Sequence, residues 1–141
     1  MRWLTWPGLE SWAGIGTAVA RVALGLVMVM HGWGKVAGGA RAWTALGSSG
    51  MAPLGLGDVA PTAFGATASF IEFFGGLLVV VGFATRPVSF LMTLVLGVAT
   101  TMHLTRDGLD AALHPIAVMA AFVLLMFVGP GSFSIDSRLS R

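Results

Sequence analysis

The stretch TAFGATASFIEFFGGLLVVVGFATRP, from Thr62 to Pro87, decides the fold, because it is long and apolar enough to cross a membrane. A lipid core is about 30 Å thick, so roughly 20 apolar helical residues span it. Glu72 is the one carboxylate within this run. A charge at that depth costs about 2.5–3.5 kcal/mol on insertion scales, and such a residue normally faces protein or water. Glu72 is therefore the first candidate functional residue.

The composition extends this interpretation to the whole chain. Its 141 residues are 56% hydrophobic and only 10% charged, with a mean hydropathy of +0.88. A soluble domain carries roughly 25% charged residues. Glycine and alanine, which let membrane helices pack closely, are plentiful. We therefore predict an all-α protein: an integral membrane four-helix transmembrane bundle that forms one domain over residues 1–141 and has the lipid bilayer as a partner.

The charged residues and the cysteine count exclude several function classes. The net charge is +2 and the pI is near 10.5, but the basic residues are scattered near the ends of apolar runs. That pattern is a topology signal and predicts no nucleic-acid partner. The chain has no cysteine, which excludes disulfide and thiolate chemistry within it. Any thiol chemistry therefore belongs to another protein.

Four apolar runs are predicted to span the membrane, at about residues 17–36, 62–83, 88–104 and 114–128. The tryptophan-rich residues 1–15 are predicted to form an N-terminal interfacial segment, because aromatic rings prefer the headgroup level. The connector 37–60 is rich in glycine and serine and is predicted to be the longest loop, with a short amphipathic piece around Arg41, Trp43 and Leu46. A loop of that length is typical of a cap or a binding element.

The distribution of basic residues predicts the orientation. Four spans place both termini on the same side of the membrane. The basic residues on or near that side outnumber those on the other: Arg2, Arg21, Arg86, Arg138 and Arg141 against Lys35, Arg41 and Arg106. The positive-inside rule then predicts a multi-pass protein of the cell inner membrane with cytoplasmic termini.

The surroundings of Glu72 allow two interpretations. At the helical rise, Glu72 is about 7 Å in depth from both Arg21 and His31 of the first span. In the architectural interpretation, Glu72 pairs with Arg21 or accepts a hydrogen bond from His31, which fixes the register of the two helices. In the functional interpretation, Glu72 lines an outward-opening pocket with His31, Lys35 and His103. Such a pocket suits a quinone head group, since quinone reduction takes up protons and needs titratable side chains.

The histidines do not predict a metal site. His31, His103 and His114 all fall in the outer half of the bundle, but they come from three different spans. None of them forms the i, i+4 pair of a preorganised ligand set. We therefore predict no metal.

The order and spacing of four motifs resemble the DoxX family of small four-helix membrane proteins. The motifs are RVALGLVMVMHGWGKVAGG from Arg21, IEFFGGLLVVVGFATRP from Ile71, a threonine- and glycine-containing span closed by His103, and GPGSFSID from Gly129. The resemblance implies that the family's signature positions are Arg21, His31, Gly32, Lys35, Glu72, Gly75, Gly76, Arg86 and His103. Among these, the catalytic candidates are Glu72, His31 and His103, and the cofactor-binding candidates are Lys35, Arg21, Gly32 and Gly76.

Members of the DoxX family are linked to membrane oxidoreductase systems. One branch is the small subunit of a thiosulfate:quinone oxidoreductase, and others are associated with sulfurtransferases and superoxide dismutase. The resemblance therefore implies a subunit of an oxidoreductase system, rather than a complete enzyme, that faces a quinone or anchors a redox partner, with other protein subunits as partners. Two alternatives stay open: a structural subunit docked on a larger respiratory or photosynthetic complex, and a small-molecule or proton pathway.

Overall fold

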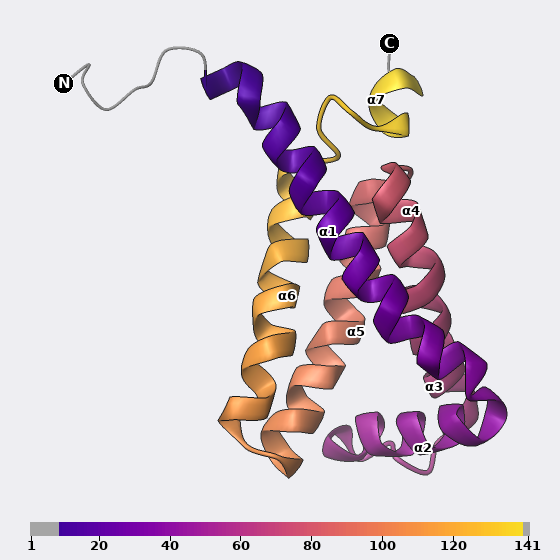
Figure 1. Ribbon diagram of the computed structural model, residues 1–141. Helices are drawn as coiled ribbons and strands as arrows, with labels where there is room; N and C mark the ends of the chain where they lie inside the picture. The colour runs from indigo at the N-terminus through magenta and orange to yellow at the C-terminus, as the bar shows by residue number, and fades with distance from the viewer. Residues whose placement is uncertain (1–8, 140–141) are drawn as a thin grey trace.

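The computed structural model describes residues 9–139, which form helices and short connections with no strand among them (Figure 1). Four helical segments are long and apolar enough to cross a membrane: Trp12–Ala37, Pro61–Val81, Thr85–Arg106 and Leu109–Val128. The predicted all-α membrane bundle is therefore confirmed. In chain order the elements are α1 (Leu9–Ala37), α2 (Gly39–Met51), η1 (Ala52–Leu54), α3 (Pro61–Phe70), η2 (Ile71–Gly75), α4 (Gly76–Val81), α5 (Thr85–Arg106), α6 (Leu109–Val128) and α7 (Ile135–Leu139).

The two ends of the four-span bundle differ in structure. Helices α3 and α4 and the π-helical turn η2 between them form one continuous second span. Helix α2 lies across one end of the bundle, called here the α2 end (Figure 1). The first turns of α1 and the short helix α7 lie at the opposite end, called here the terminal end (Figure 1).

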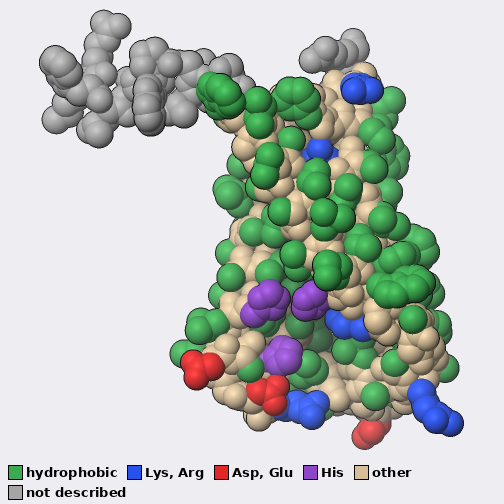
Figure 2. All heavy atoms as spheres, viewed as in Figure 1, with side chains coloured by type: hydrophobic (Ala, Val, Ile, Leu, Met, Phe, Trp, Pro, Cys, Tyr) green, Lys and Arg blue, Asp and Glu red, His purple; other side chains and the backbone are tan. Residues whose placement is uncertain are grey.

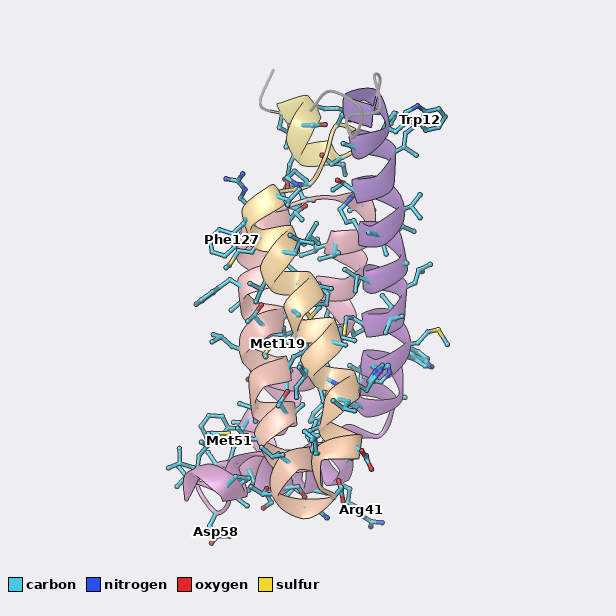
Figure 3. The ribbon with its side chains drawn as sticks, turned by 90° about the vertical axis from the view of Figure 1, so that its left-hand side faces the viewer. Trp12, Arg41, Met51, Asp58, Met119 and Phe127 are labelled. Atoms are coloured by element: carbon cyan, nitrogen blue, oxygen red, sulfur yellow. The ribbon has the colours of Figure 1, made fainter. Side chains whose placement is uncertain are left out.

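Helix α1 is longer than predicted. The interfacial segment was expected over residues 1–15, of which 1–8 lie outside the described residues. Residues 9–15 do not form a separate piece, because α1 runs without interruption from Leu9 through the first span. No proline follows Pro7 until Pro53, so none interrupts α1. Trp12 is 65% exposed and points away from the bundle (Figure 3).

The predicted loop after the first span is instead mostly helix α2, which packs along α3. The two backbones touch, since a Cβ atom at Gly47 would collide with the carbonyl of Pro61, and one at Gly65 with that of Trp43. The Trp43 indole also donates a hydrogen bond to the Lys35 carbonyl at 3.0 Å. The glycines that predicted a loop therefore serve close helix packing.

The third and fourth spans begin earlier than predicted, because proline was taken to mark a helix start. Helix α5 begins at Thr85 and holds Pro87 in its first turn, where the missing N–H costs little. Helix α6 begins at Leu109 and contains Pro115. Membrane helices tolerate such a proline. The link between the two helices is therefore very short, with Gly108 at φ +89°.

Small residues bring the first two spans into direct contact. A Cβ atom at Gly25 would lie 2.8 Å from the Gly76 carbonyl oxygen and 2.9 Å from the Val80 nitrogen. A cluster of buried apolar side chains fills the interior of the bundle: Met28, Val79, Val88, Met92, Leu96, Phe122 and Leu125. The position of α1 against α4 therefore depends on the absence of a side chain at Gly25.

Arg21 ties α1 to the end of α4 and to the segment before α7. Its guanidinium donates to the carbonyls of Val79 at 3.0 Å, Val80 at 3.1 Å and Phe133 at 2.6 Å, and the residue is only 2% exposed. The Val79 and Val80 carbonyls lie in the last turn of α4, where helix hydrogen bonding is incomplete, and the Phe133 carbonyl lies outside a helix, so Arg21 supplies donors to all three. The alternative in which Arg21 pairs with Glu72 is wrong, because its donors are directed to the terminal end.

Asp136 fixes α7 onto the start of α5. Its carboxylate accepts hydrogen bonds from the backbone N–H groups of Ala84 at 2.8 Å and Thr85 at 2.9 Å. Partial burial acts to raise the pKa of Asp136, but the hydrogen bonds from Thr85 and Ala84 and the Arg21 charge outweigh it and lower the pKa below its usual value. Asp136 thus acts as a helix cap supplied by a distant part of the chain.

We expect Gly25→Ala to destabilise the protein by about 1–3 kcal/mol, because its methyl group overpacks the contact between α1 and α4. The matched control is Gly34→Ala, also in α1, where nothing lies within 4 Å of an added Cβ atom. That variant should be neutral or more stable by about 0.5–1 kcal/mol, since alanine favours the helix. Unfolding of both in detergent micelles measures the difference, and equal stabilities would contradict the close contact.

We expect Asp136→Asn to lower the unfolding temperature at neutral pH. A carboxyl with a lowered pKa in the folded state stabilises the fold above its unfolded pKa, about 3.9, and this contribution is lost as the pH falls through the folded pKa. The difference between Asp136→Asn and the natural chain should therefore shrink below about pH 4. Unfolding scans against pH test this, with Asp58→Asn at an exposed position as the control. A difference that grows in acid would contradict the assignment.

Candidate functional site

Glu72 forms an ion pair with Lys35, the cation nearest the α2 end of α1. The Lys35 ammonium donates to both carboxylate oxygens, at 2.6 Å and 2.5 Å. Glu72 is 3% exposed, whereas the Lys35 side chain is 31% exposed. A buried carboxylate is costly unless it is paired and hydrogen-bonded, and this contact meets that requirement. The pair joins the interior of the bundle to its surface.

The acid sits in an unusual turn of helix. Glu72 lies in η2, where the second span widens into a π-helical turn between α3 and α4. Such turns insert an extra residue and are frequent at functional sites. The backbone of α1 packs directly on this turn at Gly32, because a Cβ atom there would lie 2.5 Å from the Phe73 nitrogen and 2.9 Å from the Glu72 carbonyl carbon. Gly32 therefore sets the distance between the turn and Lys35.

Beside the ion pair lies a cavity of about 520 Å³ at the α2 end, bounded by α1, α2, α3, η2 and α5. Its polar lining is limited to a few side chains, which are His31, Lys35, Thr67, Glu72 and His103. The remaining lining is apolar or small: Leu46, Gly47, Gly50, Met51, Phe64, Gly65, Ala68, Leu94, Val95, Val98, Ala99 and Met102. The cavity therefore joins an apolar wall to a small group of ionisable side chains.

The chain's three histidines gather on one face of the bundle near the α2 end, around a hollow (Figure 2). The rings of His31 and His114 stack with their centroids 5.6 Å apart. His103 Nδ1 lies 2.9 Å from Asp107 Oδ2. An ionised Asp107 accepts that hydrogen bond, which leaves Nε2 of His103 for proton exchange. In the described part of the chain, no group of three or more potential ligands is placed to hold a metal ion.

The structure brings four of the seven predicted site residues to the cavity. Glu72, His31, His103 and Lys35 all line it. The other three, predicted to bind a cofactor, lie elsewhere for identifiable reasons. Arg21 donates to backbone carbonyls at the terminal end. At both Gly32 and Gly76, the backbone of a neighbouring helix takes up the space that a side chain would occupy.

The sequence revealed His103 on α5, but not the other residues that α2 and α5 contribute to the cavity. Gly47 and Gly50, three residues apart, present a small-residue face of α2 to it. This three-residue spacing predicts a shared small-residue face, but only if residues 39–51 are taken as a helix. Apart from His103, the lining residues on α5 are apolar and carry no chemical signature that separates a cavity wall from a lipid-facing surface.

The fold and the cavity together define a small four-span integral membrane protein with a cavity inside the bundle. The chain belongs to the DoxX family, whose family model matches residues 16–104. This confirms the family resemblance found from the sequence motifs.

Two proteins of Escherichia coli strain K12 are similar to the chain over most of its length. The inner membrane protein YqjF is 28% identical over 131 residues, covering 90% of this chain and 94% of the relative. The inner membrane protein YphA is 30% identical over 129 residues, covering 85% and 87%. No solved structure matches the chain.

We expect Lys35→Met to destabilise the protein by about 3 kcal/mol, because it leaves the Glu72 carboxylate buried without a partner. Glu72→Gln should cost less, since Lys35 is partly exposed and reaches water. The double variant should be more stable than the sum of the two losses predicts. Unfolding in detergent of the four proteins gives this cycle, with Lys35→Arg as the charge-conserving control. Strictly additive losses would contradict the pairing.

Proposed function

We propose that the protein is a membrane subunit of an oxidoreductase system and that its cavity binds the ring of a quinone. The observation that carries the proposal is the pairing of an apolar cavity with ionisable groups gathered at one side. Ligand sites are typically cavities of about 300–1,000 Å³ with apolar walls and a few polar groups that fix orientation. The cavity of about 520 Å³ lies within that range.

The ionisable side chains fit the chemistry of a quinone. Reduction of a quinone to a quinol adds two electrons and two protons, so its two carbonyl oxygens need hydrogen-bond donors and a proton supply. The Lys35 ammonium can donate to one carbonyl oxygen while remaining next to Glu72. Glu72, or His103 through Nε2, can pass a proton to the same region. The electrons come from a redox partner, which makes the chain a subunit rather than a complete enzyme.

The same proposal includes a location and an orientation. Both Escherichia coli relatives carry inner membrane in their names, and the basic residues favour cytoplasmic termini. The cavity then lies in the outer half of the membrane, and the hydrogen bonds of Arg21 and Asp136 at the terminal end lie on the cytoplasmic side. A redox partner that exchanges electrons at the cavity would approach from the outer surface.

We expect Glu72→Gln to reduce quinone-dependent turnover in membranes that contain the protein with its native partners, without loss of the assembled complex. The variant removes the proton-carrying group but retains the shape of the side chain. Turnover is measured at several quinone concentrations, with the amount of protein determined in the same membranes. Asp110→Asn makes the same chemical change at an exposed position outside the cavity and should leave turnover unchanged.

Unchanged turnover in Glu72→Gln at every quinone concentration would remove the acid from the mechanism. Unchanged activity after deletion of the whole chain from a stoichiometric complex would favour the structural subunit instead. The first result shows that only the Glu72 carboxylate is dispensable for activity. The second shows that the whole chain is dispensable.

A further inference from the structure

We infer that the cavity has two openings of different character, and that its ligand is a lipid-like quinone whose hydrocarbon chain leaves between α3 and α5. This inference rests on the proposed function for the identity of the ring. It adds that the quinone carries a long chain and that the chain and the ring leave the cavity in different directions.

The lining of α5 shows how far the cavity extends around that helix. Leu94 and His103 both line it and lie nine residues apart. With 3.6 residues per turn, this separation places them on opposite sides of the helix, about 180° apart. The cavity therefore passes across the inner face of α5 from one side to the other, with an aliphatic residue at one edge and a titratable residue at the other.

The two edges also lie at different depths in the membrane. Nine residues of helix correspond to about 13 Å along the axis. His103 is within one turn of Arg106, at the α2 end of its span, whereas Leu94 is near the middle of that span. The polar edge thus lies close to the membrane surface, and the aliphatic edge lies in the hydrocarbon region.

Helices α3 and α5 are not packed against each other at the aliphatic edge. Helix α5 packs along α6, and α3 packs along α2, but α3 and α5 scarcely touch one another. Phe64 of α3 and Leu94 of α5 line the cavity and are also 39% and 53% exposed. Residues that belong both to a cavity wall and to the outer surface mark an opening, and these two are apolar.

The opposite edge is polar. His31, Lys35 and His103 line the cavity there, and the hollow beside the histidines is visible on that face (Figure 2). Protons reach the ring from the membrane surface through this opening. A hydrocarbon chain gains nothing from contact with these groups, but it is stabilised by the lipid at the gap between α3 and α5. The two openings therefore orient an amphipathic ligand, with its ring at the ion pair and its chain in the bilayer.

The test compares two quinones that share one ring, one carrying a long isoprenoid chain and one carrying only methyl groups. Their binding isotherms are measured with the full-length protein in lipid nanodiscs. Leu94→Trp fills the gap with a large side chain at an exposed position, where the fold tolerates it. Leu124→Trp, on α6 and 64% exposed outside the cavity, is the matched control. Leu94→Ala opens the gap.

We expect Leu94→Trp to weaken binding of the long-chain quinone by about tenfold or more and to change binding of the methyl quinone by less than about twofold. Leu94→Ala and Leu124→Trp should retain the binding of both. If Leu94→Trp weakens both quinones equally, or neither, the opening between α3 and α5 is overturned while the proposed function stands. If the natural protein binds neither quinone, the proposed function is overturned together with this inference.

Discussion

A single ion pair inside the membrane, Lys35 with Glu72, sets the requirements that the rest of the bundle meets. An unpaired carboxylate at that depth is costly, so the second span must present Glu72 to the cation of the first. The π-helical turn η2 and the bare backbone at Gly32 bring the two side chains together. The apolar cavity then lies beside a charged pair that is already satisfied within the protein, and a ligand can exchange hydrogen bonds with it.

Hydropathy and residue spacing predicted the four spans and the grouping of Glu72 with His31, Lys35 and His103, and the resemblance of four motifs indicated the family. These features depend on local composition and on depth along a helix, both of which a sequence displays directly. The pairing itself was not decided, because Arg21 and His31 were equally close to Glu72 in depth. The structure excludes Arg21 through its backbone partners at the terminal end, which include Phe133 from a distant part of the chain.

Other features escaped prediction because one residue type serves opposite purposes. Glycine in residues 37–60 predicted a loop, yet Gly47 permits α2 to touch α3. Pro115 predicted a helix start, yet α6 continues through it. The turn η2 has no marker in the sequence IEFFG, since a π-helical turn reflects packing on both sides of the helix. The apolar part of the cavity wall on α5 escaped for a similar reason, because apolar residues face lipid and cavities alike.

The contact between α2 and α3 has a mechanical consequence. With Gly47 and Gly65 in backbone contact, α2 cannot swing away from the second span as an independent flap. Helix α2 also packs against α5, so it braces that end of the bundle. At the opposite end, Arg21 and Asp136 fix the chain around the turn that joins α4 to α5. Access to the cavity therefore does not depend on α2 opening as a lid.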